Sequence, residues 1–538
     1  MNVAEVVGRT LVAAGVDHVF GVVGSGNFHL TNAMVAAGAR FVAARHEGGA
    51  ATMADAYARM SRSAAAVSVH QGCGLTNAMT GLTEAAKSRT PIVVVAAEVT
   101  DPKSNFFVDQ EALARAVGAV PVRIASPETA ARDAAQAVTI ATGERRTVLL
   151  NLPLQVQVQD AELAEVPSGE RRPVEPEDVG PLADLLAKAE RPVFVGGRGA
   201  RGSRSALEEL ADRCGALLAT SAVARGLFNG NPWSLDVSGG FASPLAAELI
   251  QGADLIAGWG CALNMWTMRQ GRLIGPDATV VQIDDDPSAL GAHRDVHLGV
   301  VGDVGLTARK LLETAGERRD GYRTEKVREA IASRIRWRDV PYEDTGTPDR
   351  IDPRTLSILL DDMLPADRIV SIDSGNFMGY PSMYLSVPDE NGFCFTQAYQ
   401  SIGLGLATAI GAALAQPDRL PVAALGDGGA LMGAAELDTV RRLGLPMVVV
   451  VYNDDAYGAE VHHFGPDGYP LDIVEFPPTD IAAVGRGYGF EAVTVRVPRD
   501  LEVVRDWLAG PRSAPLLIDA KVVAERGSWW LEDAFAHH

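Results

Sequence analysis

The sequence predicts an α/β protein of three doubly wound domains, each built on a parallel sheet, and three observations support this prediction. Short runs of apolar and β-branched residues alternate with longer helical patterns along most of the chain. The 538 residues are too many for one core, and a prior of about 150 residues per domain suggests three or four. Strands that alternate with helices are typical of parallel sheets covered on both faces.

Two polar segments with prolines divide the chain. Residues 155–178 form a predicted linker, and residues 318–353 form a charged segment before the last region. We therefore predict an N-terminal domain over residues 1–165, a central domain over residues 180–325 and a C-terminal domain over residues 350–525. The predicted strands are, in order, 16–21, 66–69, 91–97 and 147–152 in the first domain, 192–195 in the second, and 369–372, 421–425, 447–452 and 515–518 in the third.

The composition is that of a Gly- and Ala-rich enzyme with a large core, since 47% of the residues are hydrophobic and 22% are charged. A net charge of -20 argues against a nucleic-acid binder, and no basic run suggests a membrane surface. The expected partners are therefore small molecules and other copies of the chain, with neither nucleic acid nor membrane.

The four cysteines are scattered and form no C-x-x-C pair, which argues against a disulfide framework and a structural zinc site. Buried thiols in a reducing compartment are the expected alternative. No apolar run is long enough to span a membrane, and the first residues lack a signal-peptide pattern. These patterns predict a cytoplasmic protein.

Two neighbouring strands of the third domain end in turns rich in glycine and acidic residues. The strand at 421–425 runs into Gly426-Asp427-Gly428-Gly429-Ala430, and the strand at 447–452 runs into Asn453-Asp454-Asp455-Ala456-Tyr457-Gly458. Open parallel sheets bind ligands beyond the carboxyl ends of their strands. Hard oxygen ligands suit a small divalent ion, and glycines let amides approach phosphate oxygens. A lone Gly-Asp-Gly turn, however, also has a purely conformational explanation.

Glu47 and His70 are the candidate catalytic groups of the first domain. Glu47 lies in Arg45-His46-Glu47-Gly48-Gly49, among small residues at a strand-to-helix transition that suits proton exchange. Taken alone, a glutamate at a helix start is more often a partner of the helix dipole. His70 follows a buried strand, and its alternative role is a histidine satisfied by backbone groups in a turn.

Together these motifs resemble those of the thiamine diphosphate-dependent enzymes, among them acetolactate synthase, benzoylformate decarboxylase and pyruvate decarboxylase. The resemblance implies a pyrimidine-binding first domain, a central domain and a diphosphate-binding third domain. It also implies that Asp427, Asp454 and the backbone carbonyl of Ala456 bind Mg2+. The family has a second asparagine where this chain has Asp454, so the metal would gain one negative ligand charge. The expected cofactor neighbours are Gly426, Asp427, Gly428, Gly429, Ala430, Asp454, Ala456, Tyr457 and Gly458.

The resemblance assigns further roles. Glu47 would protonate the aminopyrimidine ring of the cofactor, so that its amino group can remove the thiazolium C2 proton. Gly375 and Asn376 would lie beside the diphosphate, and Ile402 would hold the two rings in a bent conformation. The segment around Ile402 is also typical of a Gly-rich amphipathic helix that packs on the sheet, and this interpretation is compatible with the role at the cofactor.

Substrate-side residues follow from the same likeness. Benzoylformate decarboxylase has a histidine at the place of His70 and a serine in a turn like that of Ser25, so His70 would handle protons and Ser25 would bind the substrate carboxylate. The second active-site histidine of that enzyme has no counterpart in residues 258–266. His463 falls where related enzymes often place an aromatic side chain, with a solvated helix face as its alternative. Residues 106–110 loosely match an acceptor-side region of acetolactate synthases.

The expected reaction is cleavage of a 2-oxo acid next to its carbonyl, as a lyase or transferase. The acyl carbanion equivalent is then passed to a second carbonyl, as in acetolactate synthase, or protonated, as in a simple benzoylformate decarboxylase-like lyase. A flavin-dependent oxidoreductase of the pyruvate oxidase type and a non-catalytic relative are the alternatives from other classes. The resemblance implies a homodimer or homotetramer with active sites at the dimer interface.

The central domain contains one motif that points elsewhere. Gly197, Gly199 and Gly202 follow the strand at 192–195 with the spacing of a dinucleotide-binding fingerprint. No acidic residue follows at the distance that this fingerprint requires. We interpret the motif as a tight turn between a strand and a helix, and FAD as the less favoured extra cofactor.

Overall fold

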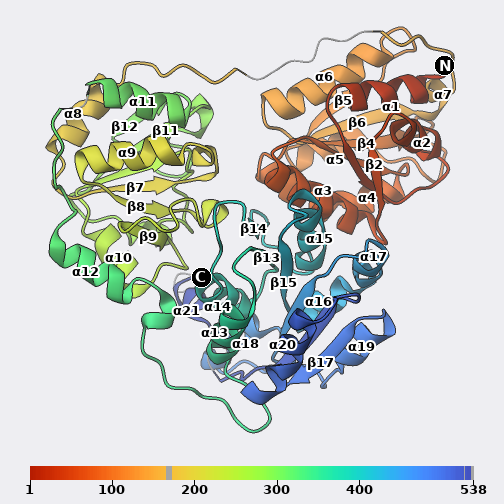
Figure 1. Cartoon of the computed structure of the whole chain (residues 1–538). Coiled ribbons are helices and arrows are strands. Elements are labelled where there is room, and N and C mark those ends of the chain that lie inside the picture. Colours follow the sequence, from red (N-terminus) through yellow and green to blue (C-terminus); the bar gives the residue numbers. More distant parts are fainter. Residues whose placement is uncertain (165–171, 315, 526, 535–538) are drawn as a thin grey trace.

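The structure, a computed structural model, describes residues 1–164, 172–314, 316–525 and 527–534, and it contains three lobes (Figure 1). Each lobe is built on a six-stranded sheet in which all strand pairs are parallel, with helices on both faces. The predicted fold class, three doubly wound α/β domains, is therefore confirmed. Residues 165–171 of the predicted linker lie outside the described residues.

The first sheet has the strand order β2-β1-β3-β4-β6-β5. Its strands are β1 His18–Gly21, β2 Arg40–Ala43, β3 Ala65–Val69, β4 Ile92–Glu98, β5 Val120–Arg123 and β6 Val148–Pro153. Its helices are α1 Val3–Ala13, α2 Phe28–Ala36, α3 Glu47–Ser61, α4 Cys73–Lys87, α5 Gln110–Ala116, α6 Ala130–Gly143 and α7 Leu154–Gln157.

The third sheet repeats this topology, with the order β14-β13-β15-β16-β18-β17. Its strands are β13 Arg368–Ile372, β14 Phe393–Phe395, β15 Leu420–Gly426, β16 Val448–Asn453, β17 Glu491–Val495 and β18 Leu516–Lys521. Its helices are α13 Pro353–Met363, α14 Gly379–Tyr384, α15 Gly405–Ala415, α16 Asp427–Met432, α17 Leu437–Arg442, α18 Gly458–Phe464, α19 Ile481–Gly487, α20 Glu502–Ala509 and α21 Trp529–Ala534.

The second sheet has a different order, β12-β11-β10-β7-β8-β9, which is that of a dinucleotide-binding fold. Its strands are β7 Pro192–Gly196, β8 Leu217–Thr220, β9 Ser234–Val237, β10 Leu255–Trp259, β11 Thr279–Asp284 and β12 Leu298–Val301. Its helices are α8 Gly180–Lys188, α9 Arg204–Cys214, α10 Pro244–Gln251 and α11 Val304–Thr314. The charged segment predicted before the third domain also contains a helix, α12 Glu325–Arg334.

Every predicted strand has a counterpart, whereas the strands that the sequence did not reveal include edges of all three sheets. The edge strands β2, β5 and β17 are only partly buried. Val42 is the one buried residue of β2 and Val495 that of β17, and every residue of β5 is at least partly exposed. The central strands β3, β4 and β16 are buried throughout. A strand covered on both faces shows a continuous apolar run, and an edge strand shows none.

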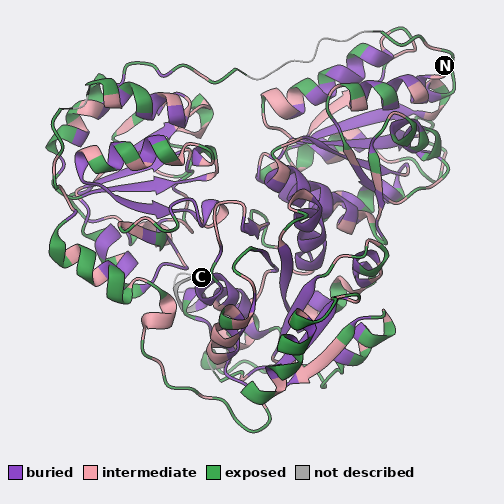
Figure 2. Cartoon of the chain, in the orientation of Figure 1, coloured by how far each residue is buried: buried purple, intermediate pink, exposed green. Residues whose placement is uncertain are grey.

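The first and third lobes pack on each other through α3 and α15. One hydrophobic cluster extends across both lobes, and it contains Met53 and Ala54 of α3 together with Ile410 of α15. Both helices are largely buried (Figure 2). Among the described residues, no helix combines the length and the apolar character needed to cross a membrane.

Candidate functional site

Three acidic residues follow three neighbouring strands of the third sheet. Asp373 comes after β13, Asp427 begins α16 directly after β15, and Asp454 follows β16. The order of strands reverses between β13 and β15, and ligands of open α/β sheets bind at such a switch point. The two turns predicted to form a metal and diphosphate site therefore meet at the edge of the sheet where binding is expected.

Asp427 and Asp454 lie close enough to repel each other. Burial, together with a smaller contribution from the Asp427 carboxylate, raises the pKa of Asp454 to about 7. Burial also raises the pKa of Asp427 to about 6, with a smaller contribution from Asp455. Two carboxylates that resist ionisation at one place are stabilised by a bound cation, which supplies the missing opposite charge.

Glycines leave the space beside these carboxylates open. A Cβ atom at Gly428 would lie 2.6 Å from the Tyr457 ring, and one at Gly458 would collide with the Asp454 carboxylate. A Cβ atom at Gly429 would collide with Asp373. Side chains at these positions would fill the site, so the glycines are required for a ligand to approach the backbone.

A cavity of ≈ 350 Å³ opens at these turns. Its polar wall comes from the two turns, and its apolar wall includes Met432 and Phe476. The residues that line it are Asp427, Gly428, Leu431, Met432, Asn453, Asp455, Tyr457, Phe476, Pro477, Thr479 and Ile481. The volume and the mixed lining are those of a small-molecule site.

The turn after β16 is held from several sides. The side chain of Asn453 donates to Asp519 at 2.8 Å, and the guanidinium of Arg350 donates to Asp455 at 2.6 Å. Asp455 has a φ of 58°, a left-handed conformation that side chains adopt at a cost. Within the described ranges no group of three His, Cys, Asp or Glu side chains could hold a metal. The two carboxylates, Asp427 and Asp454, fit Mg2+, which retains waters and binds few protein ligands.

Glu47 is the first residue of α3 and lies at the carboxyl edge of the first sheet. The side-chain amide of Asn77 donates to Glu47 Oε2 at 3.0 Å, so α4 orients the carboxylate. Glu47 is half-buried in the single chain. Among the described residues no hydrogen bond or ion pair joins Glu47 to Asp427 or Asp454 of the same chain.

Ser25 and His70 meet at the switch point of the first sheet, between β1 and β3. The backbone N–H of Gly26 donates to His70 Nδ1 at 3.3 Å, and Gly24 packs against the imidazole ring. The ring also contacts Phe106 edge to face, with centroids 5.4 Å apart. Because Nδ1 accepts a hydrogen bond, the neutral ring carries its proton on Nε2. Ser25 itself is exposed.

Ile402 lies in the loop before α15, beside residues 426–430, which we call the diphosphate turn because the diphosphate is predicted to bind there. A Cβ atom at the next residue, Gly403, would lie 3.0 Å from Met432 of α16. Gly375 has a φ of 139°, in the region open to glycine, and starts the short helix of residues 376–378. The Asn376 side chain approaches Gly458 and accepts from the backbone N–H of Ser528 at 2.9 Å. These predicted cofactor neighbours therefore surround the same turns.

His463 is half-buried on α18, and its ring contacts Phe464 edge to face at 4.5 Å. The neighbouring His462 Nε2 is buried without a hydrogen-bond partner, and burial lowers the pKa of this imidazole. Both histidines lie on α18, the helix that begins at Gly458, so they are placed beside the turn that follows β16.

Four further residues have no role predicted from the sequence. Asn77 contacts Glu47, and Asp373 lies against Gly429. Glu436 and Glu84 accept backbone N–H groups from the segments that carry Glu47 and Ile402. Asp373 occupies a strand end, which is the same signal that identified Asp427. Glu84 is fully buried within α4, where an acidic residue on an apolar helix face is unusual. That anomaly was visible in the sequence.

The dinucleotide-like turn of the central domain is closed by its own backbone. The N–H groups of Gly197 and Gly199 donate to the carbonyls of Trp259 and Gly260 at 2.9 and 3.1 Å. A Cβ atom at Gly197 would collide with the carbonyl of Gly260. The glycines therefore serve close packing, as expected for a tight turn.

Comparison with known proteins gives three family matches in order along the chain. These are "Thiamine pyrophosphate enzyme, N-terminal TPP binding domain" over residues 1–117, the central domain of the same enzymes over residues 179–311 and their "C-terminal TPP binding domain" over residues 373–520.

Curated relatives align over most of their own length. A probable 2-ketoarginine decarboxylase of Pseudomonas aeruginosa is 30% identical over 93% of this chain and 90% of its own. A sulfoacetaldehyde acetyltransferase of Roseovarius nubinhibens is 27% identical over 99% of this chain and 94% of its own. An acetolactate synthase large subunit of Parasynechococcus marenigrum is 27% identical over 94% and 85%. These relatives therefore include acyltransferases, synthases and decarboxylases.

Proposed function

Since the chain belongs to the family of thiamine pyrophosphate enzymes, we propose that it is a decarboxylase or carboligase that uses thiamine diphosphate and Mg2+ to cleave a 2-oxo acid. The observation that carries this proposal is the pair of Asp427, which is buried, and Asp454, which is half-buried, beside three glycines at the switch point of the third sheet. A 2-oxo acid also agrees with the name of the 2-ketoarginine decarboxylase relative.

The third domain would hold the cofactor. Asp427, Asp454 and the carbonyl of Ala456 would bind Mg2+, and the amides at the start of α16 would face the diphosphate. Ile402 would support the rings. When bound, thiamine diphosphate supplies a nucleophilic carbon and accepts the electron pair released when the carbon–carbon bond breaks.

Glu47 would hold a proton at its carboxylate and exchange it with the aminopyrimidine ring. Asn77 donates to Oε2, which leaves Oε1 for the shared proton. His70 would move a proton at Nε2, because its Nδ1 accepts from Gly26. Ser25 would bind the substrate carboxylate, and His463 would line the acyl side of the pocket.

A second copy of the chain would complete the site. Glu47 and the Asp427 turn lie in different lobes, and large apolar side chains are exposed beside each. Phe106 and Phe107 are 45% and 40% exposed near His70, and Met432 is 62% exposed on α16. Exposed apolar patches of this kind mark protein interfaces. We propose a homodimer, or a homotetramer built from such dimers, with Glu47 of one copy facing Asp427 of the other.

The test removes bound metal with a chelator, restores thiamine diphosphate and Mg2+, and follows CO2 release from pyruvate, benzoylformate and 2-ketoarginine. Release that depends on both additions supports the proposal, and the preferred substrate indicates the size of the acyl pocket. A second product formed when an aldehyde is added distinguishes carboligation from simple decarboxylation. Protein that binds neither thiamine diphosphate nor Mg2+ would contradict the proposal.

A further inference from the structure

The loop between β14 and α15, residues 396–404, carries Ile402 and has an unusual backbone. Gln400 has a φ of 59° and Gly403 a φ of 87°, one on each side of Ile402. A left-handed conformation at a residue other than glycine is unfavourable and persists only where surrounding contacts enforce it. The loop therefore needs anchors, and it has one before Ile402 and one after it.

The first anchor is Glu84 of α4, which belongs to the first domain. Its carboxylate is fully buried and accepts the backbone N–H groups of Ala398 at 3.0 Å and Tyr399 at 2.6 Å. Burial opposes the ionisation of Glu84, but Arg59 and these two amides outweigh it and hold the pKa of the carboxyl below its usual value. Glu84 is therefore an anion whose acceptors point at the loop.

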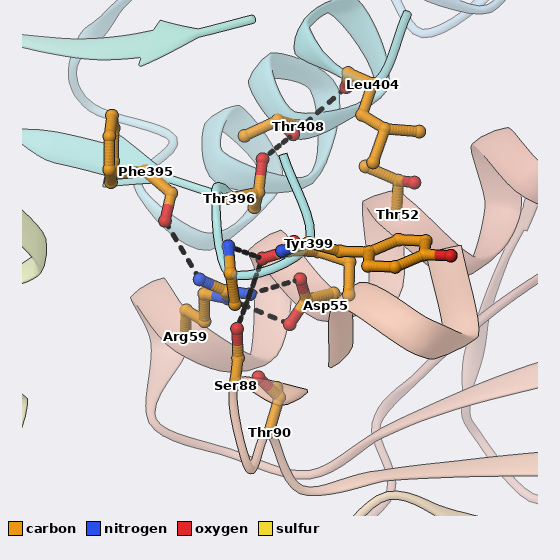
Figure 3. A network of polar contacts seen from close by, with 12 residues as sticks. Thr52, Asp55, Arg59, Ser88, Thr90, Phe395, Thr396, Tyr399, Leu404 and Thr408 are labelled. Atoms are coloured by element: carbon orange, nitrogen blue, oxygen red, sulfur yellow. Dashed lines mark hydrogen bonds and ion pairs between the residues drawn. The ribbon is translucent and has the colours of Figure 1, made fainter. Parts of the chain in front are cut away.

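Arg59 of α3 completes this anchor, and its contacts are drawn in Figure 3. Its guanidinium donates to Glu84 at 2.8 Å, to Asp55 at 2.7 and 2.8 Å and to the carbonyl of Phe395 at 2.9 Å. Phe395 ends β14, so Arg59 fixes the start of the loop while Glu84 fixes its next turn. The whole anchor is buried, which excludes water as a competing partner.

The second anchor is Asp373 at the end of β13. Its Oδ2 accepts the backbone N–H of Gly403 at 3.0 Å, and its Oδ1 accepts the N–H of Ser374 at 2.8 Å. Asp373 also lies against Gly429 of the diphosphate turn. Ile402 is thus fixed between a carboxylate of its own domain and a carboxylate of the first domain.

We propose that Glu84 is a positioning residue that sets the place of Ile402 by holding the N–H groups of Ala398 and Tyr399. The proposal rests on the function proposed above, in which Ile402 supports the bent cofactor. Glu84 is not among the described residues that line the cavity, and it is hydrogen-bonded to the loop, so it would act through the loop. If the loop shifts, Ile402 would support the cofactor rings less well and proton removal from the cofactor would slow, whereas Asp427 and Asp454 would still hold the metal and the amides of α16 would still face the diphosphate.

The substitution Glu84→Gln tests the proposal sharply. One carboxylate oxygen accepts from Arg59, Ser88 and Ala398, and the other accepts from Tyr399. An amide must therefore place its NH2 group against an N–H donor in either orientation, and at least one loop contact is lost. Arg59 keeps Asp55 as its ion-pair partner, so no buried charge is left uncompensated.

A second pair of variants leaves Glu84 intact. Tyr399→Pro removes the N–H that Glu84 Oε2 accepts, and Tyr399→Ala keeps it. Both lose the aromatic ring, which is 49% exposed. A difference between the two variants therefore reports the backbone at residue 399, that is its N–H together with the φ that proline fixes, and not the side chain.

The readout is the exchange of the C2 proton of bound thiamine diphosphate with D2O, in the presence of Mg2+ and without substrate. Calorimetry gives the dissociation constant of thiamine diphosphate for the same proteins. We expect Glu84→Gln and Tyr399→Pro to slow the exchange about tenfold, the effect of losing one hydrogen bond to a charged group. The dissociation constant should change less, because the diphosphate contacts persist, and Tyr399→Ala should resemble the wild type.

Combination with Ile402→Ala decides whether Glu84 acts through Ile402. The double variant Glu84→Gln with Ile402→Ala should exchange no more slowly than Ile402→Ala alone. Asp361→Asn, which disturbs the buried pair of Asp361 with Arg368, is the matched control that should leave exchange unchanged. The proposal is overturned if the effects of Glu84→Gln and Ile402→Ala add in the double variant. It is also overturned if Glu84→Gln and Tyr399→Pro exchange the C2 proton at the wild-type rate. A wild type that binds no thiamine diphosphate would instead refute the proposed function.

Discussion

One carboxylate oxygen of Glu436 accepts the backbone N–H of His46 at 3.0 Å, directly before Glu47. The same oxygen accepts the N–H of Arg45 at 3.0 Å, and the other accepts the hydroxyl of Thr439 at 2.6 Å. Glu436 follows α16, the helix that Asp427 begins. A residue of the third domain therefore fixes the start of α3, where the proposed activating carboxylate lies.

Glu436→Ala should destabilise the protein by about 2–3 kcal/mol and slow cofactor activation, because two partly buried N–H groups lose their acceptor. Glu436→Gln is the matched control. Its amide oxygen can accept both N–H groups, and its NH2 can donate to the Thr439 hydroxyl, so both properties should stay near wild type. Urea unfolding and C2 proton exchange measure the two effects. If Glu436→Ala and Glu436→Gln lost equal amounts of stability and of exchange rate, the negative charge of Glu436 would be responsible and not the geometry of its acceptor oxygens.

Glu47→Gln should keep thiamine diphosphate binding and lose most activity, since an amide cannot supply the proton. Asp427→Asn should lose metal-dependent binding. If Glu47 of one copy faces Asp427 of the other, a mixed dimer of the two variants contains one intact site. Unfolding and refolding the two inactive proteins together should recover about a quarter of wild-type activity, because half of randomly formed dimers are mixed. No recovery, with mixed dimers shown by native mass spectrometry, would place both residues in one copy.

Asp454→Asn replaces the residue that departs from the family's paired asparagines. The metal-free protein should gain stability, on the order of 1 kcal/mol, because the repulsion with Asp427 disappears. Mg2+ should bind about tenfold more weakly, since one ligand charge is lost. Thermal unfolding with and without Mg2+ checks both effects. A variant that binds Mg2+ as tightly as the wild type would show that Asp454 is not a ligand.

Three of the four cysteines should resist alkylation in the folded protein. Burial raises the pKa of Cys214 and Cys261 to about 11 and that of Cys394 to about 12. A raised pKa keeps the thiol protonated at neutral and mildly alkaline pH, and only the thiolate reacts. Iodoacetamide at about pH 8 should modify Cys73 alone, which is exposed, and all four cysteines after unfolding. Modification of a second cysteine while the circular dichroism stays native would contradict this.

Gly197→Ala should destabilise the central domain by about 1–3 kcal/mol, because the added methyl group meets the carbonyl of Gly260. Gly143→Ala is the control, since no atom lies within 4 Å of a Cβ there. Addition of FAD or NADH should leave the melting temperature of the wild type unchanged, because the amides of the turn already donate within the chain. A clear increase with either would restore the dinucleotide interpretation.

Continuous apolar runs revealed the central strands of the first and third sheets, and the turns after two of these strands revealed Asp427 and Asp454. In the second sheet only β7 was predicted, although β8 and β10 are also buried throughout. The edge strands β2, β5 and β17 were not predicted, because half-exposed strands mix polar and apolar residues and show no continuous apolar run. Asp373 was overlooked although it follows a predicted strand. Glu84 could not be given a role, because its partners at Ala398 and Tyr399 lie far away in the chain.

The amino-acid sequence was therefore sufficient to predict the three α/β domains, the two glycine- and acid-rich turns after β15 and β16, and the residues that start α3 and α4. These features depend on local periodicity and on the rule that ligands bind at strand ends, and both are written in short stretches of chain. Only the tertiary structure decided that Glu84 and Asp373 hold the Ile402 loop and that Glu436 holds the start of α3. The partners in these contacts lie between 30 and 391 positions apart in the chain, so they meet only through tertiary packing and no local pattern encodes them.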